Sequence, residues 1–425
     1  MFENGVKETL LACVNSSCHS LKNLLKWLLL GAAVGVLVGL VGSVFAHVLA
    51  FANGFRTDHP MVVLGLPVGG LLIVWLYHIS HNTSDRGTNT VISSVHSSSD
   101  IPFRMTPLIF ISTAITHLCG GSAGREGAAI QLGGSMCNYL GKAIELKPNE
   151  RRVVIMCGMS AGFSALFGTP MAAAVFSLEV ISIGIMHYSA LVPCVTASLV
   201  SHFVAKLFRV PPESFPVPEV PVMDTLGLVR IITFAAAAAV VSILFCLVMH
   251  KIAALYKTCL KNSYLRVFVG GSLIILLSLA LRTDAYLGSG MGIIEHIFHE
   301  GEASPWAFLL KILFTALTLG AGFKGGEIVP SFTVGAAFGC LLAAPLGLPV
   351  PLAAACGMIG VFCGVTNCPI TSLLISFELF GFAGMPYYLV TAAVSFMLSG
   401  NYGLYHAQRL IYSKTETRYI NDCAR

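Results

Sequence analysis

The sequence places two carboxylates in glycine-rich stretches between apolar segments. Glu126 follows Arg125 in "GGSAGREGAAIQLGG" (120–134), and Glu327 lies in "GGEIVP" (325–330). A carboxylate at the depth of a bilayer is costly, so ionisable residues there indicate function. Glycines let backbone N–H groups approach a ligand, and the start of a helix presents N–H groups with partial positive charge. The pattern predicts anion sites at these helix starts, where a carboxylate such as that of Glu126 can itself occupy the site of the anion.

The composition indicates the environment in which these groups lie. Of 425 residues, 56% are hydrophobic and only 11% are charged, with a mean hydropathy of +0.81. A soluble domain carries about a quarter charged residues, so the chain is predicted to be a polytopic membrane protein. The net charge of +5 comes from scattered basic residues, which excludes nucleic acid as the expected partner.

Apolar segments run from about residue 24 to residue 413, and Gly or Pro interrupts many of them before they reach the roughly 20 residues of a full crossing. Broken and re-entrant helices fit this pattern, because protein or a watery cavity can cover their free backbone groups. We therefore expect an all-α, multi-pass protein. Segment 225–256 is long enough to cross the bilayer with a tilt.

The two ends of the chain are predicted to be short and cytoplasmic. Residues 1–23 read as a short, partly amphipathic helix followed by the polar stretch 15–23, and residues 413–425 read as a tail. Lys and Arg flank the membrane part on both sides, which favours both termini in the cytoplasm of a cell-membrane protein. The membrane part is then 24–412.

An internal repeat divides this membrane part into halves of about 24–208 and 225–412. "CGMSAGFSALFGTPMAAAVFSLE" (157–179) matches "CGMIGVFCGVTNCPITSLLISFE" (356–378) at seven positions, namely Cys, Gly, Met, Phe, Pro, Ser and Glu. Upstream, the alignment places Glu126 near Glu327 at a spacing of 201. Repeated, broken apolar segments indicate a transporter with its binding site between the repeats, and inverted repeats are the usual arrangement.

These stretches resemble the CLC family of anion channels and anion/proton antiporters. "GREGA" (124–128) looks like the gating-glutamate motif of that family, and "GGEIVP" looks like its second glycine-rich motif. "GTNT" (87–90) falls where the family has an anion-binding loop, and Tyr405 falls where it has a pore tyrosine. The resemblance implies a CLC fold of two inverted repeats and a homodimer.

Within that family, the sequence is most similar to the fluoride/proton antiporter branch. Ala128 stands where chloride members have Pro, "GTNTV" replaces their serine loop, and Glu327 replaces an apolar residue. The inner proton acceptor of chloride exchangers has no counterpart, because Val180 occupies its position. The resemblance therefore implies fluoride export coupled to proton antiport, with a chloride channel or a chloride/proton exchanger of the same fold as the alternative.

The resemblance assigns roles to individual residues. Glu126 would be the gating and proton-transfer group and Glu327 the second proton or anion carboxylate, while a capping Glu is the alternative for each. The anion would be bound by Thr88, Tyr405 and the stretches around Gly127, Ala128, Glu327 and Ile328. A helix N-cap is the alternative for Thr88, and an interfacial aromatic is the alternative for Tyr405.

Other motifs are interpreted as structural. We expect Arg125 to hold its loop by donating to backbone carbonyls, with direct anion binding as the alternative. The equivalent Glu179 and Glu378 are expected to be polar helix ends at water or at a dimer rim. The thirteen cysteines read as packing residues. We expect no enzyme, no cofactor and no metal, although Ser160 in "GMSAG" and the pair His296 and His299 formally leave open a membrane-embedded enzyme.

Overall fold

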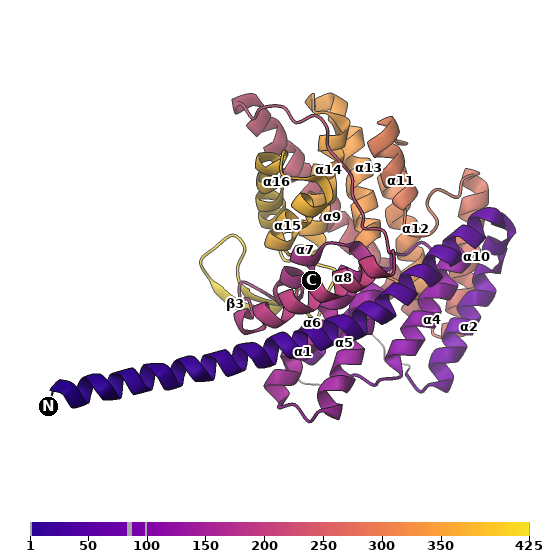
Figure 1. The fold of residues 1–425 in the computed structure, drawn as a ribbon. Helices are drawn as coiled ribbons and strands as arrows, with labels where there is room; N and C mark the ends of the chain where they lie inside the picture. The colour runs from indigo at the N-terminus through magenta and orange to yellow at the C-terminus, as the bar shows by residue number, and fades with distance from the viewer. Residues whose placement is uncertain (1, 83–86, 98–99, 425) are drawn as a thin grey trace.

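The computed structural model describes residues 2–82, 87–97 and 100–424. These residues form mostly α-helices, as predicted, together with a small three-stranded sheet. In Figure 1 the N-terminal half, coloured indigo to magenta, lies mostly below the C-terminal half, coloured orange to yellow. Within the described residues, six helices are long and apolar enough to cross a membrane, which agrees with the predicted multi-pass protein.

The first half of the chain contains α1 (Phe2–Asp58), the 3-10 helix η1 (Pro60–Gly65), α2 (Leu66–Ile79), α3 (Thr88–Ser97), α4 (Met105–Leu118), α5 (Glu126–Ala143), α6 (Pro148–Phe167), α7 (Pro170–Glu179), β1 (Ser182–Ile183), the 3-10 helix η2 (Tyr188–Ala190) and α8 (Leu191–Leu207). The second half contains α9 (Thr225–Cys259), α10 (Ser263–Leu281), α11 (Met291–Glu300), α12 (Ala307–Ala321), α13 (Ile328–Leu346), α14 (Val350–Thr366), α15 (Pro369–Phe380), α16 (Met385–Leu398), β2 (Arg409–Tyr412) and β3 (Tyr419–Cys423).

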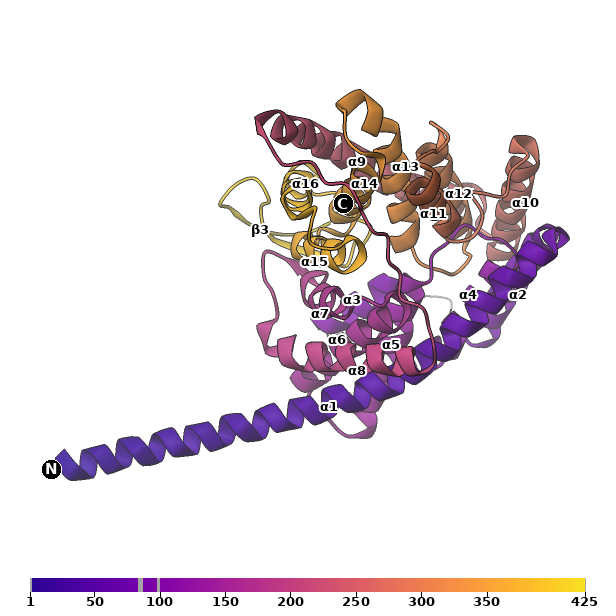
Figure 2. The same cartoon turned by 45° about the horizontal axis from the view of Figure 1, so that its top comes forward.

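The helices of the two halves correspond one to one, from α1 with α9 to α8 with α16. The same pairs pack in both halves: α5 lies against α6 as α13 lies against α14, and α1 lies against α8 as α9 lies against α16. Contacts between the halves join equivalent helices, namely α2 with α10, α5 with α13, and α7 with α15. Figure 2 shows the two sets of helices side by side. The repeat in the sequence is therefore a repeat in structure.

Close backbone contact holds the central helix pair of each half together. A Cβ atom on Gly158 of α6 would collide with the carbonyl group of Gly133 of α5, and a Cβ atom on Gly357 of α14 would collide with that of Gly335 of α13. Small residues permit such packing in membrane proteins, where no hydrophobic effect drives helices together.

Helix α1 departs from the prediction. It runs without a break from Phe2 to Asp58, so the separate short helix ending at the polar stretch 15–23 is wrong. That stretch contains neither Gly nor Pro, and its Ser and Asn residues each reduce helix stability by only a few tenths of a kcal/mol. The N-terminal part of α1 projects away from the other helices in Figure 1.

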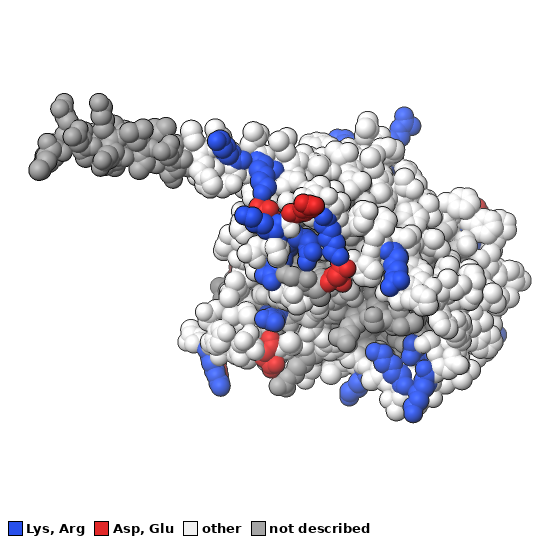
Figure 3. All heavy atoms as spheres, turned by 90° about the horizontal axis from the view of Figure 1, so that it is seen from below, with Lys and Arg blue, Asp and Glu red and all other residues white. Residues whose placement is uncertain are grey.

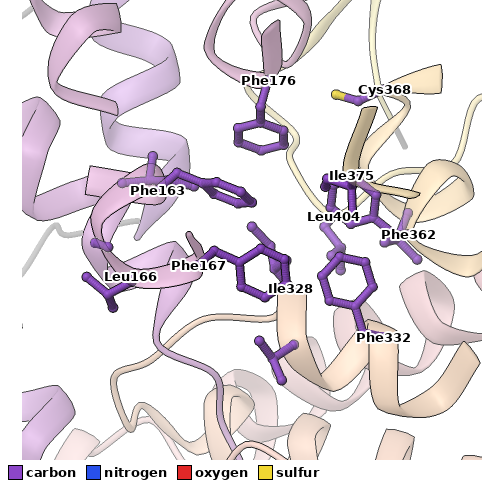
Figure 4. Packing of buried hydrophobic residues seen from close by; sticks show 14 of the residues in the cluster. Phe163, Leu166, Phe167, Phe176, Ile328, Phe332, Phe362, Cys368, Ile375 and Leu404 are labelled. Carbon is purple, nitrogen blue, oxygen red and sulfur yellow. The ribbon is translucent and has the colours of Figure 1, made fainter. Parts of the chain in front are cut away.

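Aromatic side chains fill the seam between the halves. The ring centroids of Phe167 and Phe332 lie 5.5 Å apart, and those of Phe332 and Phe362 lie 4.9 Å apart. Phe176 of α7 faces Phe362 of α14 at 6.2 Å. Figure 4 shows these rings turned toward one another from helices of both repeats. Apolar packing across the seam therefore joins the repeats into one body.

Glu179 and Glu378 join the halves through reciprocal helix capping. Glu179, at the end of α7, accepts from the N–H groups of Ile370 and Thr371 at the start of α15, at 3.0 and 2.9 Å. Glu378 of α15 accepts from the N–H groups of Met171 and Ala172 at the start of α7, at 2.8 and 2.9 Å. Their structural role is thus as expected, but Glu179 is buried in the seam and does not end at water. Each carboxylate satisfies free N–H groups of the opposite repeat.

The last apolar segment of the sequence, 404–413, is not a helix. It continues into β2, which pairs in parallel with β1 and antiparallel with β3. The segment thereby returns Tyr405 to the middle of the molecule, between α16 and the sheet.

Candidate functional site

Two loops, one from each half, cross at the centre of the molecule. Gly124 and Gly326 form an isolated antiparallel bridge with two N–H···O bonds of 2.7 Å. The next residue is the N-cap of the following helix in both halves: Arg125 before α5, with φ −114° and ψ −22°, and Glu327 before α13, with φ −98° and ψ −12°. Arg125 is thus the structural equivalent of Glu327, and Glu126 that of Ile328. The predicted pairing of Glu126 with Glu327 is wrong by one residue.

The crossing brings the starts of α5 and α13 together with the start of α3. A Cβ atom placed on Gly127 would lie 2.9 Å from the Cα atom of Gly326 and 3.5 Å from both Glu327 Oε2 and Thr88 Oγ1. Predicted ligands from three separate stretches therefore surround the space beside Gly127. Helix starts that converge in this way concentrate partial positive charge, which favours an anion.

Glu126 occupies the start of its own helix. Its side chain is fully buried, and the backbone N–H of Arg125 donates to Glu126 Oε2 at 3.1 Å. Arg125 Nε donates to Glu126 Oε1 at 3.3 Å, while Arg125 Nη2 donates to the carbonyl of Leu166 at 3.2 Å. Arg125 braces the loop through a backbone carbonyl, as predicted, and it also pairs with the carboxylate beside it.

Arg125 makes one contact that could not be expected from the sequence. Its Nη2 atom donates to Glu213 Oε1 at 2.6 Å. Glu213 lies in the irregular linker between α8 and α9, a region whose position cannot be derived from hydrophobic periodicity. Arg125 is thus shared between two carboxylates.

Glu327 differs from Glu126 in its environment. Its Oε2 atom is buried and has no hydrogen-bond partner in the described part of the chain. A buried acceptor without a partner is unfavourable by about 1–3 kcal/mol. Such a group is suited to hold a proton, or to accept from a protonated ligand.

Thr88 belongs to a small polar cluster. It is buried at the start of α3, and Gln131 Nε2 lies 3.3 Å from Thr88 Oγ1. Gln131 lies on α5 one turn after Gly127, and it is also buried. The sequence interpretation missed Gln131, although a buried amide one turn from the glycine of the site was a usable signal.

Tyr405 also reaches this region. The residue is buried, and its hydroxyl group has no hydrogen-bond partner among the described residues. Its segment is fixed from two sides: Ala407 N donates to Asn89 Oδ1 of α3 at 2.9 Å, and Leu404 N donates to the carbonyl of Val365 at 2.8 Å. The hydroxyl group lies close enough to Glu327 and Glu126 for the charges of the carboxylates to act on it. The predicted hydroxyl donor is therefore free to bind a ligand near the two carboxylates.

A cavity of about 500 Å³ leads away from this cluster. Ala128, Gln131 and Glu327 line one part of it, and Lys257 and Arg266 line another. Lys324, which follows α12, also borders the cavity and lies over the Tyr77 ring at 4.4 Å. The basic side chains along this route would attract an anion.

Lys311 supports the first crossing loop, the one that contains Gly124. It is fully buried in α12 and donates to Ser122 Oγ at 2.9 Å and to the carbonyls of Tyr286 and Gly288 at 3.1 and 2.8 Å. Ala123 N also donates to the Gly288 carbonyl, at 3.1 Å. Lys311 thus fixes the backbone directly before Gly124. A lysine in an otherwise apolar helix carried a signal that the sequence interpretation overlooked.

The remaining predicted residues lie as follows. Ala128 and Ile328 are fully buried in the first turns of α5 and α13. Ser160 is buried inside α6 and donates to the carbonyl of Cys194 at 3.1 Å, without the strand–turn–helix context of a nucleophile. His296 and His299 lie on α11, and no group of metal-ligating side chains occurs among the described residues.

Comparisons with known proteins agree with this geometry. The family model described as "Voltage gated chloride channel" matches residues 69–400. A chloride/fluoride channel protein of Pseudomonas syringae pv. tomato is 38% identical over 396 residues, which cover 92% of this chain and 87% of the relative. The crystal structure of a CLC-type fluoride/proton antiporter matches with a TM-score of 0.88 and 32% identity, covering 91% of this chain and 98% of that chain.

More distant relatives are chloride transporters. The H(+)/Cl(-) exchange transporter ClcA of Vibrio cholerae is 25% identical over 389 residues, which cover 83% of this chain and 81% of the relative. The structure of a slow cyanobacterial Cl-/H+ antiporter matches with a TM-score of 0.78 at 19% identity, covering 88% of this chain and 94% of that chain. At this identity the likeness concerns the fold.

Proposed function

We propose that this protein exports fluoride in exchange for protons. The proposal proceeds from the finding that the chain belongs to the voltage-gated chloride channel (CLC) family. The observation that carries the proposal is the position of Glu327: its Oε2 atom is buried and has no hydrogen-bond partner among the described residues. This atom lies 3.5 Å from where a Cβ atom of Gly127 would be, as does Thr88 Oγ1. Two similar proteins, a chloride/fluoride channel protein and a CLC-type fluoride/proton antiporter, have fluoride in their names, which supports the choice of anion.

The gate follows from the position of Glu126. Its carboxylate lies where the N–H groups at the start of α5 would bind an anion. An anion that enters must displace this carboxylate, and protonation removes the charge that holds the carboxylate in place. One side chain can therefore open the path for the anion and carry the proton in the opposite direction.

Glu327, Thr88 and Tyr405 complete the proposed site. Fluoride is small and strongly hydrated, so a selective site must replace its lost water with strong donors at close range. A protonated Glu327, the two hydroxyl groups and the N–H groups around Gly127, Ala128 and Ile328 are such donors. Glu327 can thus take part in both anion binding and proton transfer.

The anion would reach this site through the cavity that Lys257 and Arg266 line. Basic side chains raise the local concentration of anions and increase their rate of association. Lys and Arg side chains also outnumber acidic ones on the face of the molecule drawn in Figure 3. By the positive-inside rule we assign that face to the cytoplasm.

The surroundings of the transporter are part of the same proposal. We place it in the cell membrane with both termini in the cytoplasm, as a homodimer of 24–412 membrane domains flanked by the segments 1–23 and 413–425. No cofactor takes part: fluoride, protons and the lipid bilayer are its partners.

The test is the efflux of fluoride from proteoliposomes under a proton gradient, recorded with fluoride and pH electrodes. We expect a proton gradient to drive fluoride uphill, and Glu126→Gln to reduce the coupled proton movement to background. Fluoride flux without proton movement in the unaltered protein would contradict antiport.

Chloride is the second candidate, because the hydroxyl of Thr88 lies at the site where chloride members have serine. It would be favoured if the same vesicles released chloride and fluoride at equal rates.

A further inference from the structure

The linker between α8 and α9 places a third carboxylate beside the gate. Glu213 lies on this linker, and its N–H donates to the carbonyl of Phe167 at the end of α6, at 3.4 Å. Two residues later, Phe215 N donates to the carbonyl of Leu379 of α15 at 2.8 Å. The linker runs up along the second half in Figure 1. Contacts to both repeats therefore fix Glu213 in position.

Backbone geometry at the end of α6 adds to this fixation. Gly168 has a φ of +78°, and the space where its Cβ atom would lie is occupied by Pro212. Only glycine combines this conformation with so close a neighbour. The residue before Glu213 is thus packed directly against the helix end that carries the Leu166 carbonyl bound by Arg125.

Glu213 and Glu126 share one guanidinium group. Arg125 Nη2 lies 2.6 Å from Glu213 Oε1, and Arg125 Nε lies 3.3 Å from Glu126 Oε1. The side chain of Glu126 is 0% exposed, whereas those of Arg125 and Glu213 are 20% and 19% exposed. The three groups form a short chain of charges from the closed gate toward water.

The charges of this chain do not balance. With both carboxylates ionised, two negative charges surround one positive charge, and a proton on Glu126 makes the cluster neutral. If Glu213 were uncharged, the charges of Arg125 and an ionised Glu126 would already balance, and Glu126 would take up a proton only at a lower pH. Charges at such short range, mostly shielded from water, interact strongly.

We propose that Glu213 is the counter-charge that sets the pH at which Glu126 takes up its proton. It is a positioning residue, because it acts through Arg125 and has no contact with the anion site. The inference rests on the proposed function. Because they share the guanidinium of Arg125, we expect the two carboxylates to titrate as a coupled pair. Burial raises the pKa of Glu213 itself, and the adjacent Arg125 opposes that shift.

Other ionisable groups face this cluster and stay constant in the test. Glu327 approaches from the second crossing loop and Tyr405 from the C-terminal segment. His117 of α4 contacts the Gly124 carbonyl at 3.4 Å, and Glu295 of α11 interacts with Glu213. None of them shares the guanidinium of Arg125 in the described structure. A change at Glu213 therefore alters one neighbour of the gate.

The experiment measures coupled fluoride transport of the full-length protein against pH in proteoliposomes. We expect Glu213→Gln to move the midpoint of the profile toward acid by about one pH unit, because Arg125 then stabilises ionised Glu126 alone. Glutamine keeps an oxygen that accepts from Arg125, so a purely structural brace would leave the midpoint in place. Glu213→Asp, which keeps the charge, should restore the unaltered midpoint.

Glu219→Gln is the matched control, because Glu219 is an exposed carboxylate on the same linker. It should leave the profile unchanged. A midpoint for Glu213→Gln that equals the unaltered one, or that moves toward alkaline pH, overturns the inference. Should Glu213→Gln not fold, Glu213→Ser takes its place with the same expected acid shift. Failure of the proposed function is distinguishable, since the unaltered protein would then show no coupled fluoride transport at any pH.

Discussion

The two crossing loops have nearly the same backbone and opposite charges. Both loops meet in the bridge between Gly124 and Gly326, and both place the next residue at the N-cap of a long helix. In the first half that residue is Arg125, which pairs with two carboxylates. In the second half it is Glu327, whose Oε2 atom has no partner among the described residues.

The difference in side chains makes the two halves of a symmetric fold unequal. The equivalent backbones of the two halves both supply N–H groups to the site, and these suit an anion equally in either half. The side chains then make one loop a closed ion pair that reaches the surface, and the other an open acceptor beside the cavity. In our proposal, the gate lies on the first loop and the second proton-transfer carboxylate on the second.

We expect the contact between the two crossing loops to be the most sensitive to mutation. A Cβ atom on Gly326 would lie 2.6 Å from Gly127 N and 3.1 Å from Gly127 Cα, so Gly326→Ala must separate the loops. We expect it to abolish coupled transport and to lower the free energy of unfolding by about 1–3 kcal/mol. Fluoride efflux and thermal unfolding in detergent measure the two effects.

Gly292→Ala is the control for this change, since a Cβ atom there meets nothing within 4 Å. If Gly326→Ala transported fluoride as fast as Gly292→Ala, the crossing would not be required for transport.

Substitution of Glu327 gives the next largest expected effect on transport. Glu327→Gln keeps the shape of the side chain and removes its ability to hold a proton. We expect proton-coupled fluoride transport to fall about a hundredfold, as for loss of a general acid–base group, with the folded state intact. Glu416→Gln, an exposed carboxylate of the C-terminal segment, serves as the control. Unchanged coupling in Glu327→Gln would remove the proposed asymmetry between the loops.

The reciprocal caps offer a comparison of the halves by stability. Glu179 accepts three hydrogen bonds, including one of 2.6 Å from Thr371 Oγ1, whereas Glu378 accepts two. Glu179→Ala should therefore lower the free energy of unfolding by about 2–3 kcal/mol and Glu378→Ala by about 1–2 kcal/mol. Denaturant titration in detergent tests this order. Equal losses would mean that the additional bond to Thr371 contributes nothing.

The start of α3 gives the smallest expected effect. Thr88 faces Gln131, whereas the equivalent start of α11 places Ser289 and Gly290 against Thr333. Thr88→Val keeps the volume and removes the hydroxyl group, so we expect the apparent affinity for fluoride to fall about fivefold, as for one lost hydrogen bond. Concentration dependence of fluoride efflux measures it. An unchanged affinity would assign Thr88 to helix capping alone.

The sequence was sufficient for the helical class, the repeat and the glycine-rich loops, because composition and internal similarity are visible in one chain. The sequence was not sufficient for the structural pairing of Arg125 with Glu327, because only the bridge between Gly124 and Gly326 fixes the alignment of the two loops to the residue. Glu213 was missed and Tyr405 was found only through the family resemblance, because both lie on irregular segments whose paths depend on contacts with other parts of the fold. Such contacts leave no periodic signal.

The reciprocal capping of α7 and α15 bears on how the chain matures. Met171 N–H meets its acceptor on Glu378, 207 positions later. During synthesis, the start of α7 therefore leaves the ribosome long before its acceptor exists. The first repeat can enter the bilayer early, but α7 completes the hydrogen bonds at its start only when α15 of the second repeat arrives. A chain truncated before residue 378 would hence present quality-control proteases with an unfinished seam.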